Sequence, residues 1–225
     1  MEFNLKEQSV RELNQTLHDL PQDSNETVSV EGIVGEHNLC VGLNVSLDIT
    51  LKGHAGYYCA GMNKHASIVV EGNVGQGVAE NMMSGKVHVK GNASQSAAAT
   101  AHGGLLVVDG DAAARCGISM KGVNIVVKGS VGHMSAFMGQ SGCLVVCGNA
   151  GEALGDSLYE AHLYVKGTVE SLGADCIEKE MRAEHIAELK ALLDEAGCED
   201  KPEDFTRYGS ARQLYTFKVD NASAY

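Results

Sequence analysis

The sequence has no tryptophan, only two prolines and only 5% aromatic residues, and its charge is one-sided. Lysine and arginine number 17 against 29 aspartates and glutamates, for a formal net charge of −12. A nucleic-acid backbone binds clusters of basic side chains, so this balance argues against a nucleic-acid partner. The sequence also lacks a run of about 18 apolar residues, the length of a membrane-spanning helix. Residues 1–19 lack the apolar stretch of a signal peptide. We therefore expect a soluble, cytoplasmic protein.

The seven cysteines are an odd number at irregular spacing, unlike the framework of a secreted disulfide-rich protein. They are Cys40, Cys59, Cys116, Cys143, Cys147, Cys176 and Cys198. A reducing compartment fits this pattern better. The closest pair, Cys143 and Cys147, has three intervening residues, whereas zinc knuckles and thioredoxin-like motifs typically have two. We expect the cysteines to act as small apolar side chains. Metal or redox use of the closest pair is the minor alternative.

A glycine recurs at a constant spacing of 19 residues, with no insertion or deletion. The seven positions are Gly53, Gly72, Gly91, Gly110, Gly129, Gly148 and Gly167. The residues four and two before each glycine are always aliphatic, and the residue just before it is mostly charged. This alternation predicts a strand with one buried face. No apolar stripe of helical spacing separates the strands, which excludes a βαβ architecture. We predict an all-β fold, a parallel β-helix of about seven 19-residue coils.

Small residues mark two further phases of the repeat. Alanine or valine always stands two residues after the glycine, and only alanine or glycine stands seven residues after it. We interpret the repeating glycine as a corner that uses positive φ. We interpret the later position, which includes Ala98 and Ala174, as a second tight corner with room inside only for a hydrogen or a methyl group. A partial copy at residues 28–32 predicts an irregular first coil.

Helices are predicted at both ends, where they would cap the open sheet edges of a β-helix. Ser9 and Glu12 form a capping box that begins a stripe of apolar residues ended by Pro21. A second stripe over about residues 178–196 ends at Gly197. We expect an N-terminal helical cap over residues 1–27, the β-helix over 28–177, and a C-terminal helix and tail over 178–225.

The tail is rich in aromatic residues, which favours docking either on a partner or back onto the rod. These residues are Tyr208, Tyr215, Phe217 and Tyr225.

No catalytic, cofactor-binding or metal-binding residue is predicted from the sequence. The glycines of residues 72–77 have the reverse spacing of the dinucleotide fingerprint, and residues 84–86 lack the remainder of a P-loop. Glu71 and Asp109 are not on adjacent coils, so the carboxylate pair of a sugar-cleaving enzyme is missing. The histidines fall at different phases and form no column of metal ligands. They are His54, His65, His88, His102, His133 and His162 within the repeat. This pattern points to a structural subunit.

The repeats resemble the GXGXG domain family. The motif Gly148-x-x-Gly151-x-x-x-Gly155 carries the likeness, with degenerate copies that begin at Gly53, Gly72 and Gly129. This family includes the C-terminal β-helix of the glutamate synthase large subunit and the GXGXG-containing subunit of formylmethanofuran dehydrogenase. Residues 11–14 (RELN) and 208–215 (YGSARQLY) look most like the free-standing GXGXG subunit of N-methylglutamate synthase, and the length also fits such a subunit.

The resemblance implies a right-handed β-helix that is a non-catalytic part of a larger enzyme. It would lie between a class II glutamine-amidotransferase-like subunit and an FMN and iron–sulfur synthase-like subunit, and it would help to shape an ammonia channel between them. The implied reaction converts methylamine and glutamate into N-methylglutamate and ammonia. The catalytic thiol, FMN and iron–sulfur cluster lie in the partners, so no such role transfers to a residue here. Gly75, Gly77 and Gly132 are candidates for partner contact.

Three other functions stay open from the sequence. The chain has the features expected of the same subunit in a split glutamate synthase, or of the GXGXG-containing subunit of formylmethanofuran dehydrogenase. A stand-alone β-helix enzyme acting on sugars is the alternative from a different class.

Overall fold

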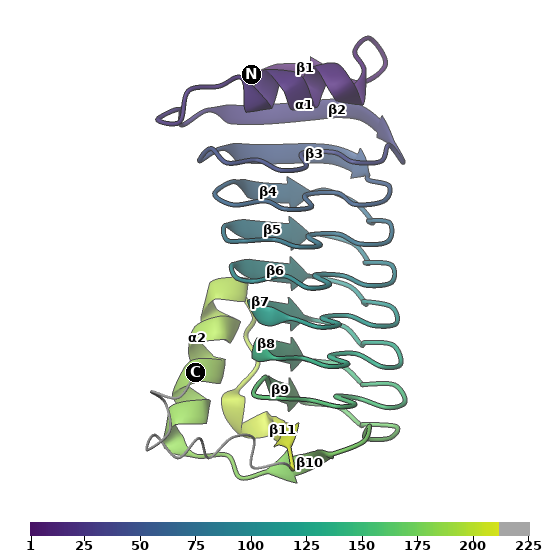
Figure 1. The fold of residues 1–225 in the computed structure, drawn as a ribbon, viewed down its shortest axis with the longest axis vertical. Coiled ribbons are helices and arrows are strands. Elements are labelled where there is room, and N and C mark those ends of the chain that lie inside the picture. Colours follow the sequence, from purple (N-terminus) through teal and green to yellow (C-terminus); the bar gives the residue numbers. More distant parts are fainter. Residues whose placement is uncertain (212–225) are drawn as a thin grey trace, which may run out of the picture.

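Parallel strands, one from each coil, form one continuous sheet along the side of a rod (Figure 1). The computed structural model describes residues 1–211. Each strand from β2 to β9 pairs in parallel with the next. The strands are β2 (Thr27–Val34), β3 (Asp48–His54), β4 (Ser67–Val70), β5 (Lys86–Val89), β6 (Leu105–Val108), β7 (Lys121–Val127), β8 (Ser141–Val146) and β9 (His162–Val165). The predicted parallel β-helix of about seven coils is confirmed.

The register of the sheet follows the repeat. Ile49 lies beside Ile68, and Ile68 lies beside Val87, so that equivalent residues of successive coils stack. The coil before them is irregular, as predicted: Val28 pairs with Ile49, 21 positions on, and the register shifts between Val30 and Ile33. The stacking places each aliphatic position of the repeat in a column inside the rod.

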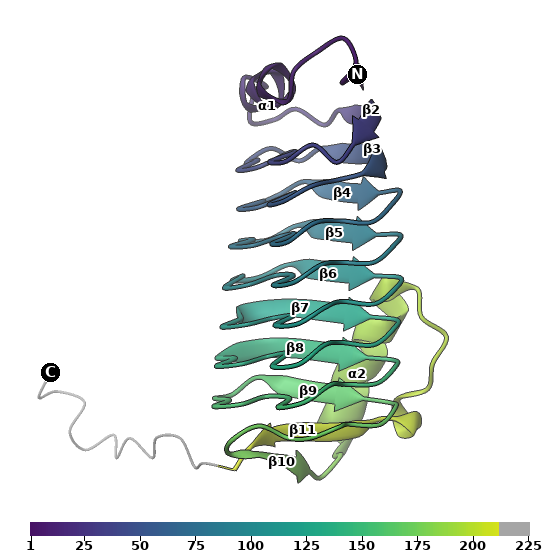
Figure 2. The same cartoon turned by 90° about the vertical axis from the view of Figure 1, so that its right-hand side faces the viewer.

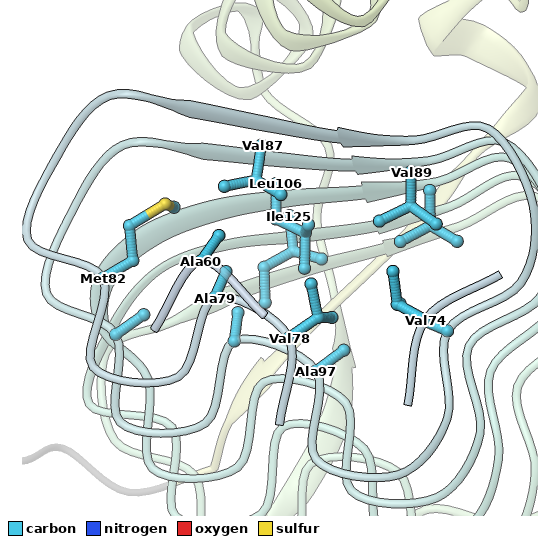
Figure 3. Close-up of a cluster of buried hydrophobic side chains, with 14 of the residues drawn as sticks. Ala60, Val74, Val78, Ala79, Met82, Val87, Val89, Ala97, Leu106 and Ile125 are labelled. Carbon is cyan, nitrogen blue, oxygen red and sulfur yellow. The ribbon is translucent and has the colours of Figure 1, made fainter. Parts of the chain in front are cut away.

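The interior columns form the main hydrophobic core. Val87, Leu106 and Ile125 follow one another from β5, β6 and β7, and none is exposed (Figure 3). Val78 and Ala97 approach them from the opposite wall of their coils. Burial of an aliphatic side chain contributes on the order of 2 kcal/mol, so the stacking of coils, and not local strand propensity, holds the fold.

Left-handed backbone recurs at three alternate positions, five, seven and nine residues after the repeating glycine, in the six coils from Gly53 to Gly148. In one coil these are Ser96 (φ 61°), Ala98 (φ 52°) and Thr100 (φ 55°). The second tight corner is therefore confirmed at Ala98, which is fully buried, and at its equivalents from Ala60 to Gly155. The prediction is wrong for Ala174, which is exposed. The last coil is one residue shorter at this point: Leu154 bridges to Leu172, which is 18 positions later in the chain and not 19.

The repeating glycine is needed for a different reason from the one predicted. Among the seven, only Gly53 has a positive φ. The others lie against the coil before: a Cβ on Gly110 would be 2.1 Å from Asn92 Oδ1 and 2.9 Å from the carbonyl oxygen of Gly91. The Gly110 N–H donates to that same carbonyl at 3.0 Å. Glycine is thus required by close approach between coils.

A ladder of polar side chains runs beside the glycines. The residue after each of the first six glycines presents an acceptor atom to the backbone N–H of the equivalent residue in the next coil. Asn73 Oδ1 accepts from the N–H of Asn92 at 2.8 Å, and Asn92 Oδ1 accepts from the N–H of Asp111 at 2.8 Å. His54, Asp111, Ser130 and Asn149 continue the pattern. These side chains satisfy backbone donors that the turn would otherwise leave unpaired.

The N-terminal end is covered by β1 (Glu2–Asn4), which pairs with β2, and by α1 (Val10–His18), which lies across the first coil (Figures 1 and 2). The capping box is present, since the Glu12 N–H donates to Ser9 Oγ at 3.2 Å and the Ser9 N–H donates to Glu12 Oε2 at 2.7 Å. Leu13 and Leu17 are fully buried. Asn14 donates to the carbonyl of residue 38 at 2.8 Å and accepts from the N–H of residue 40 at 2.9 Å, which replaces bonds that a preceding coil would make.

The C-terminal helix lies beside the coils. Figure 1 shows α2 (Ala183–Ala196) along the outer face of the sheet, next to β7 and β8. Leu189, Leu192 and Leu193 pack with outward side chains of the sheet such as Val126 and Val145. Strands β6 to β9 are consequently buried on both faces, whereas the sequence pattern predicted one buried face.

The last coil is closed by strands. β10 (Cys176–Lys179) and β11 (Thr206–Ser210) pair antiparallel, and β11 inserts between β9 and β10 after the short 3-10 helix η1 (Pro202–Asp204). Tyr208, one of the tail aromatics, lies half-buried in β11 against the core. Tyr215, Phe217 and Tyr225 lie outside the described residues.

No helix in residues 1–211 has the length and apolar character needed to cross a bilayer.

Candidate functional site

On the outer face of the sheet, the residues just before the repeating glycines form a column. Basic and acidic side chains alternate in this column from Lys52 to Lys128, so their charges offset one another. Asp109 on the coil of β6 accepts from Lys128 Nζ at 2.8 Å, lies 3.5 Å from Lys90 Nζ and 2.9 Å from His88 Nε2. Partial burial acts to raise the pKa of Asp109, but Lys128 and His88 outweigh it and lower the pKa to about 2. Burial also lowers the pKa of His88. Asp109 thus ties adjacent coils together through ion pairs with Lys128 and Lys90 and a hydrogen bond with His88.

A second polar cluster lies between β8, β9 and α2, with Glu188 at its centre. His162 Nδ1 is 2.8 Å from Glu188 Oε2, and the Tyr164 hydroxyl donates to the same oxygen. The Cys143 thiol belongs to the same group, since the ligand atoms of Cys143, His162 and Glu188 all lie within 4.8 Å of one another. The His185 ring packs edge-on against His162, with centroids 5.4 Å apart. The helix thus contributes a carboxylate to three donors on the sheet.

The electrostatics of this cluster favour a structural role. Burial and then Glu188 raise the pKa of the Cys143 thiol and of the Tyr164 hydroxyl, so both keep their protons at neutral pH. Burial also acts to raise the pKa of Glu188, but the bonds from Tyr164 and His162 outweigh it and keep the carboxylate charged. A protonated thiol that is only 4% exposed is a poor nucleophile. The thiol, imidazole and carboxylate therefore form an anchor for α2, although they resemble a catalytic triad in composition.

A pair of thiols forms the third cluster, at the end of α2. The Sγ atoms of Cys147 and Cys198 are 3.6 Å apart, and Cys198 Sγ lies 3.2 Å from Asp200 Oδ2. All seven cysteines are free, and five of them are buried. The pair singled out from the sequence, Cys143 and Cys147, is not brought together as one site, because its members belong to two different clusters. No sequence pattern indicates that Cys147 and Cys198 meet, since 51 positions separate them.

The comparisons with known proteins give one local match. A segment of 57 residues, 25% of this chain, is 63% identical to Protein GlxC of Rhizobium meliloti (strain 1021). The match spans a quarter of the length of that curated relative. It supports the glutamate-synthase-like resemblance of the chain at that local level. No protein-family model matches the sequence.

The glycines expected to contact a partner are explained within the chain. A Cβ on Gly75 would lie 2.7 Å from the carbonyl carbon of Gly56, and a Cβ on Gly132 would lie 2.6 Å from the backbone nitrogen of Ala114. Gly77 has a φ of 74°. Gly132 also borders a shallow depression beside Asp111 and the polar ladder. Their conformations are dictated by the coil, so contact with a partner stays a prediction.

The histidines of the repeat divide by their surroundings. His54 accepts from the N–H of Asn73 at 3.0 Å and belongs to the polar ladder. His88 and His162 contact carboxylates, whereas His65, His102 and His133 are exposed. The partners of His88 and His162 come from the next coil and from α2, so a search along the sequence for one column of histidines could not find them.

The turn edge of the rod carries exposed methionines. Met62 and Met138 lie at left-handed positions of their coils and Met83 follows one, and the three are 45%, 39% and 47% exposed. Met62 and Met138 occupy equivalent positions, nine residues after the repeating glycine, and both have left-handed backbone. Unbranched, polarisable methionine side chains suit an adaptable contact surface. We call this set the methionine edge.

Proposed function

We propose that this chain is a non-catalytic β-helix subunit of a glutamate-synthase-like complex, most specifically an N-methylglutamate synthase (methylamine–glutamate N-methyltransferase). In this proposal it lies in the cytoplasm, between a class II glutamine-amidotransferase-like subunit and a synthase-like subunit that holds FMN and an iron–sulfur cluster. Residues 28–177 supply the GXGXG β-helix, residues 1–27 cap it, and within residues 178–211 helix α2 covers the side of the sheet and β11 closes its last coil.

The observation that carries the proposal is the motif Gly148-x-x-Gly151-x-x-x-Gly155 and its place in the coil. A Cβ on Gly148 would be 2.6 Å from Ser130 Oγ, and a Cβ on Gly151 would be 3.1 Å from the carbonyl carbon of Gly132. A Cβ on Gly155 would be 2.8 Å from Cys176 Sγ. The motif glycines thus lie in close contact with neighbouring segments of the stack, and the motif resembles that of the GXGXG domain. The local identity to Protein GlxC supports the same relationship.

The polar residues of the repeat support a structural role. The side chains of the ladder, including Asn73 and Asn92, accept bonds from the next coil, and the Asp109 and Glu188 carboxylates hold coils and helix together. These groups are therefore committed to contacts within the chain. The methionine edge is the surface that we expect a partner to cover.

The test is purification of the native complex through an affinity tag on the full chain, followed by identification of its components. We expect an amidotransferase-like chain and a flavoprotein to co-purify, and the complex to convert methylamine and glutamate into N-methylglutamate and ammonia. Turnover only with glutamine, 2-oxoglutarate and a reductant would favour the split glutamate synthase. A tungsten or molybdenum pterin partner would favour formylmethanofuran dehydrogenase, and an active lone chain would contradict all three.

A pair of matched variants tests the interface. Met62→Glu places a charge on the methionine edge, and Thr50→Glu places one on the open part of the sheet, where Thr50 is half-buried on β3. We expect the first variant to weaken assembly and the second to leave it intact, because burial of an unpaired charge at an interface is costly. Equal assembly of both variants would remove the methionine edge from the proposal.

A further inference from the structure

Two thiols and a carboxylate converge where α2 ends against the sheet. Cys147 directly follows β8, and Cys198 directly follows the helix C-cap, Gly197, whose backbone is left-handed with φ 63°. The side chain of Asp200 turns back to Cys198. One ligand atom from each of Cys147, Cys198 and Asp200 lies within 4.8 Å of the others. Segments 51 positions apart therefore meet through three side chains that bind metals.

The distances suit one tetrahedral ion. Zinc bonds to sulfur at about 2.3 Å and to carboxylate oxygen at about 2.0–2.2 Å, so a tetrahedral ion separates two sulfurs by about 3.8 Å and a sulfur from an oxygen by about 3.6 Å. The corresponding separations here are 3.6 Å between Cys147 and Cys198, and 3.2 Å between Cys198 and Asp200. Shifts of a few tenths of an ångström would bring the three atoms to that geometry.

The surroundings complete the site electrostatically. Two thiolates and one carboxylate carry three negative charges, a divalent ion leaves one of them, and Lys166 balances it. Lys166 Nζ lies 2.6 Å from Asp200 Oδ1, which leaves Oδ2 directed at the sulfurs and holds the carboxylate in place. The C-terminal carbonyls of α2 also favour a cation nearby. Cys147, Cys198 and Asp200 are all only partly buried, so an ion can reach them from solvent.

We propose that Cys147, Cys198 and Asp200 form a binding site for a thiophilic divalent cation such as zinc, with the fourth position open to water. On binding, both thiols release their protons to solvent and two metal–sulfur bonds form. The bound ion links the end of α2 to the solenoid and stabilises the docked helix.

The geometry favours this site over its two competitors. At Glu188 the carboxylate already accepts from Tyr164 and His162, and Cys143 is almost completely buried. A disulfide between Cys147 and Cys198 would use the two sulfurs but would leave the contact of Asp200 without a role. The carboxylate held by Lys166 is the feature that points to a cation.

The experiment is a titration of the reduced, metal-stripped full chain with cobalt(II), a coloured substitute for zinc. We expect one cobalt per chain, with a sulfur-to-cobalt charge-transfer band and the intense visible bands of tetrahedral cobalt, which zinc then displaces. Burial and then Cys198 raise the pKa of Cys147, so the ion must displace a tightly held proton from that thiol. Apparent affinity should therefore fall by up to roughly a hundredfold per pH unit on acidification, since two protons are released.

Variants separate the possible outcomes. Cys198→Ser and Asp200→Asn should abolish or strongly weaken the cobalt spectrum, whereas Cys143→Ser, in the neighbouring cluster, should leave it unchanged. Thermal unfolding of each variant without metal checks that it is folded. Absence of a sulfur-to-cobalt band in the wild-type chain, or its loss in Cys143→Ser alone, would overturn the proposal. A Cys147–Cys198 disulfide in the isolated chain, with no cobalt binding after reduction, would assign the pair to redox chemistry instead.

Discussion

At the scale of single residues, the coil depends on positions where a larger side chain has no room. Ala98 is fully buried and has a φ of 52°, so its methyl group points into a corner walled by the neighbouring coils. We expect Ala98→Leu to destabilise the protein by about 1–3 kcal/mol, because extra methylene groups in a packed core force side chains and backbone apart. Urea unfolding at neutral pH measures this difference.

Ser96→Leu is the matched control for Ala98→Leu. Ser96 lies two residues earlier in the same coil, has a similar φ of 61° and is only half-buried. It therefore reproduces the cost of leucine in left-handed backbone without the overpacking. If the two variants lose the same stability, the corner at Ala98 is not sterically closed and the backbone alone explains the loss.

Asp109 gives a prediction about pH. The pKa of its carboxyl group is about 2 in the folded chain, below the value of about 3.9 usual for an unfolded aspartate. Its stabilising effect is therefore present above about pH 4 and is lost as the pH falls towards 2. We expect Asp109→Asn to cost up to about 2 kcal/mol at pH 7, since a pKa shift of one unit corresponds to about 1.4 kcal/mol.

The gap in stability between wild type and Asp109→Asn should narrow between pH 4 and pH 2, as measured by denaturant unfolding across that range. Asp48→Asn, a change of an exposed carboxylate at the start of β3, is the control for general loss of negative charge. A gap that stayed constant from pH 7 to pH 2 would show that the ion pair to Lys128 and the hydrogen bond to His88 contribute nothing.

Residues also show what the sequence could and could not reveal. The strict period identified Gly110 and its equivalents as special, but whether a glycine serves positive φ or close approach depends on the coil beside it. The polar ladder had a readable signal, because a residue with a side-chain acceptor follows every repeating glycine, from His54 to Thr168. The meeting of Cys147 with Cys198 had none, since it depends on where α2 docks.

At the scale of elements, the docking of α2 is the feature that the repeat pattern concealed. The outward position three residues before the glycine is Thr50, Val69 or His88 in early coils and Val107, Val126, Val145 or Tyr164 in late ones. The change from a mixed set to an unbroken run of apolar and aromatic residues marks the part of the sheet that α2 covers. The same change explains why a helix expected at the end of the rod lies along its side, where an apolar surface needs cover.

Leu189→Ala tests how firmly α2 is held. Leu189 is fully buried against the sheet, so truncation should weaken docking by about 3 kcal/mol, equivalent to roughly a hundredfold increase in the open population. Cys143 lies beneath the helix and is 4% exposed. We therefore expect its alkylation to accelerate about a hundredfold, as followed by peptide mass spectrometry.

Lys190→Ala is the control for the docking of α2. Lys190 is exposed on the far side of the helix and pairs with Asp194 at 2.8 Å, an interaction worth only a few tenths of a kcal/mol. Its loss should leave the alkylation of Cys143 almost unchanged. Comparable acceleration in both variants would mean that Cys143 becomes accessible by a route other than the opening of α2.

At the scale of the whole molecule, a stack of coils has two ends that must each be closed. A parallel sheet presents unpaired backbone groups and an open core at its last coil, and either end invites another chain to continue the stack. Here α1 supplies Asn14 to the backbone of residues 38 and 40, and β11 closes the other end by antiparallel pairing. The sequence predicted that the ends are capped because the need follows from the architecture. The sequence did not predict that a strand closes the C-terminal end, because β11 lies in a segment that lacks the repeat pattern.

Leu17→Asp should open the N-terminal end. Leu17 is fully buried in the main core from α1, and a carboxylate there would have no partner to offset its loss of water. The helix should leave the first coil, and exposed strand edges and core side chains should then join molecules end to end. We expect light scattering on a concentration series to show dimers and larger species that the wild type does not form at the same concentrations.

Thr16→Asp provides the comparison, because Thr16 is the exposed neighbour of Leu17 on the same helix and the added charge is identical. This variant should show the same association state as the wild type at the same concentrations. Association by both variants would attribute the effect to charge on α1, and association by neither would mean that the first coil is closed without the helix. Association by Leu17→Asp alone is expected only if further coils can add to the end of the rod and the cap normally prevents this. A stack of repeating coils, which the 19-residue period indicates, has that property.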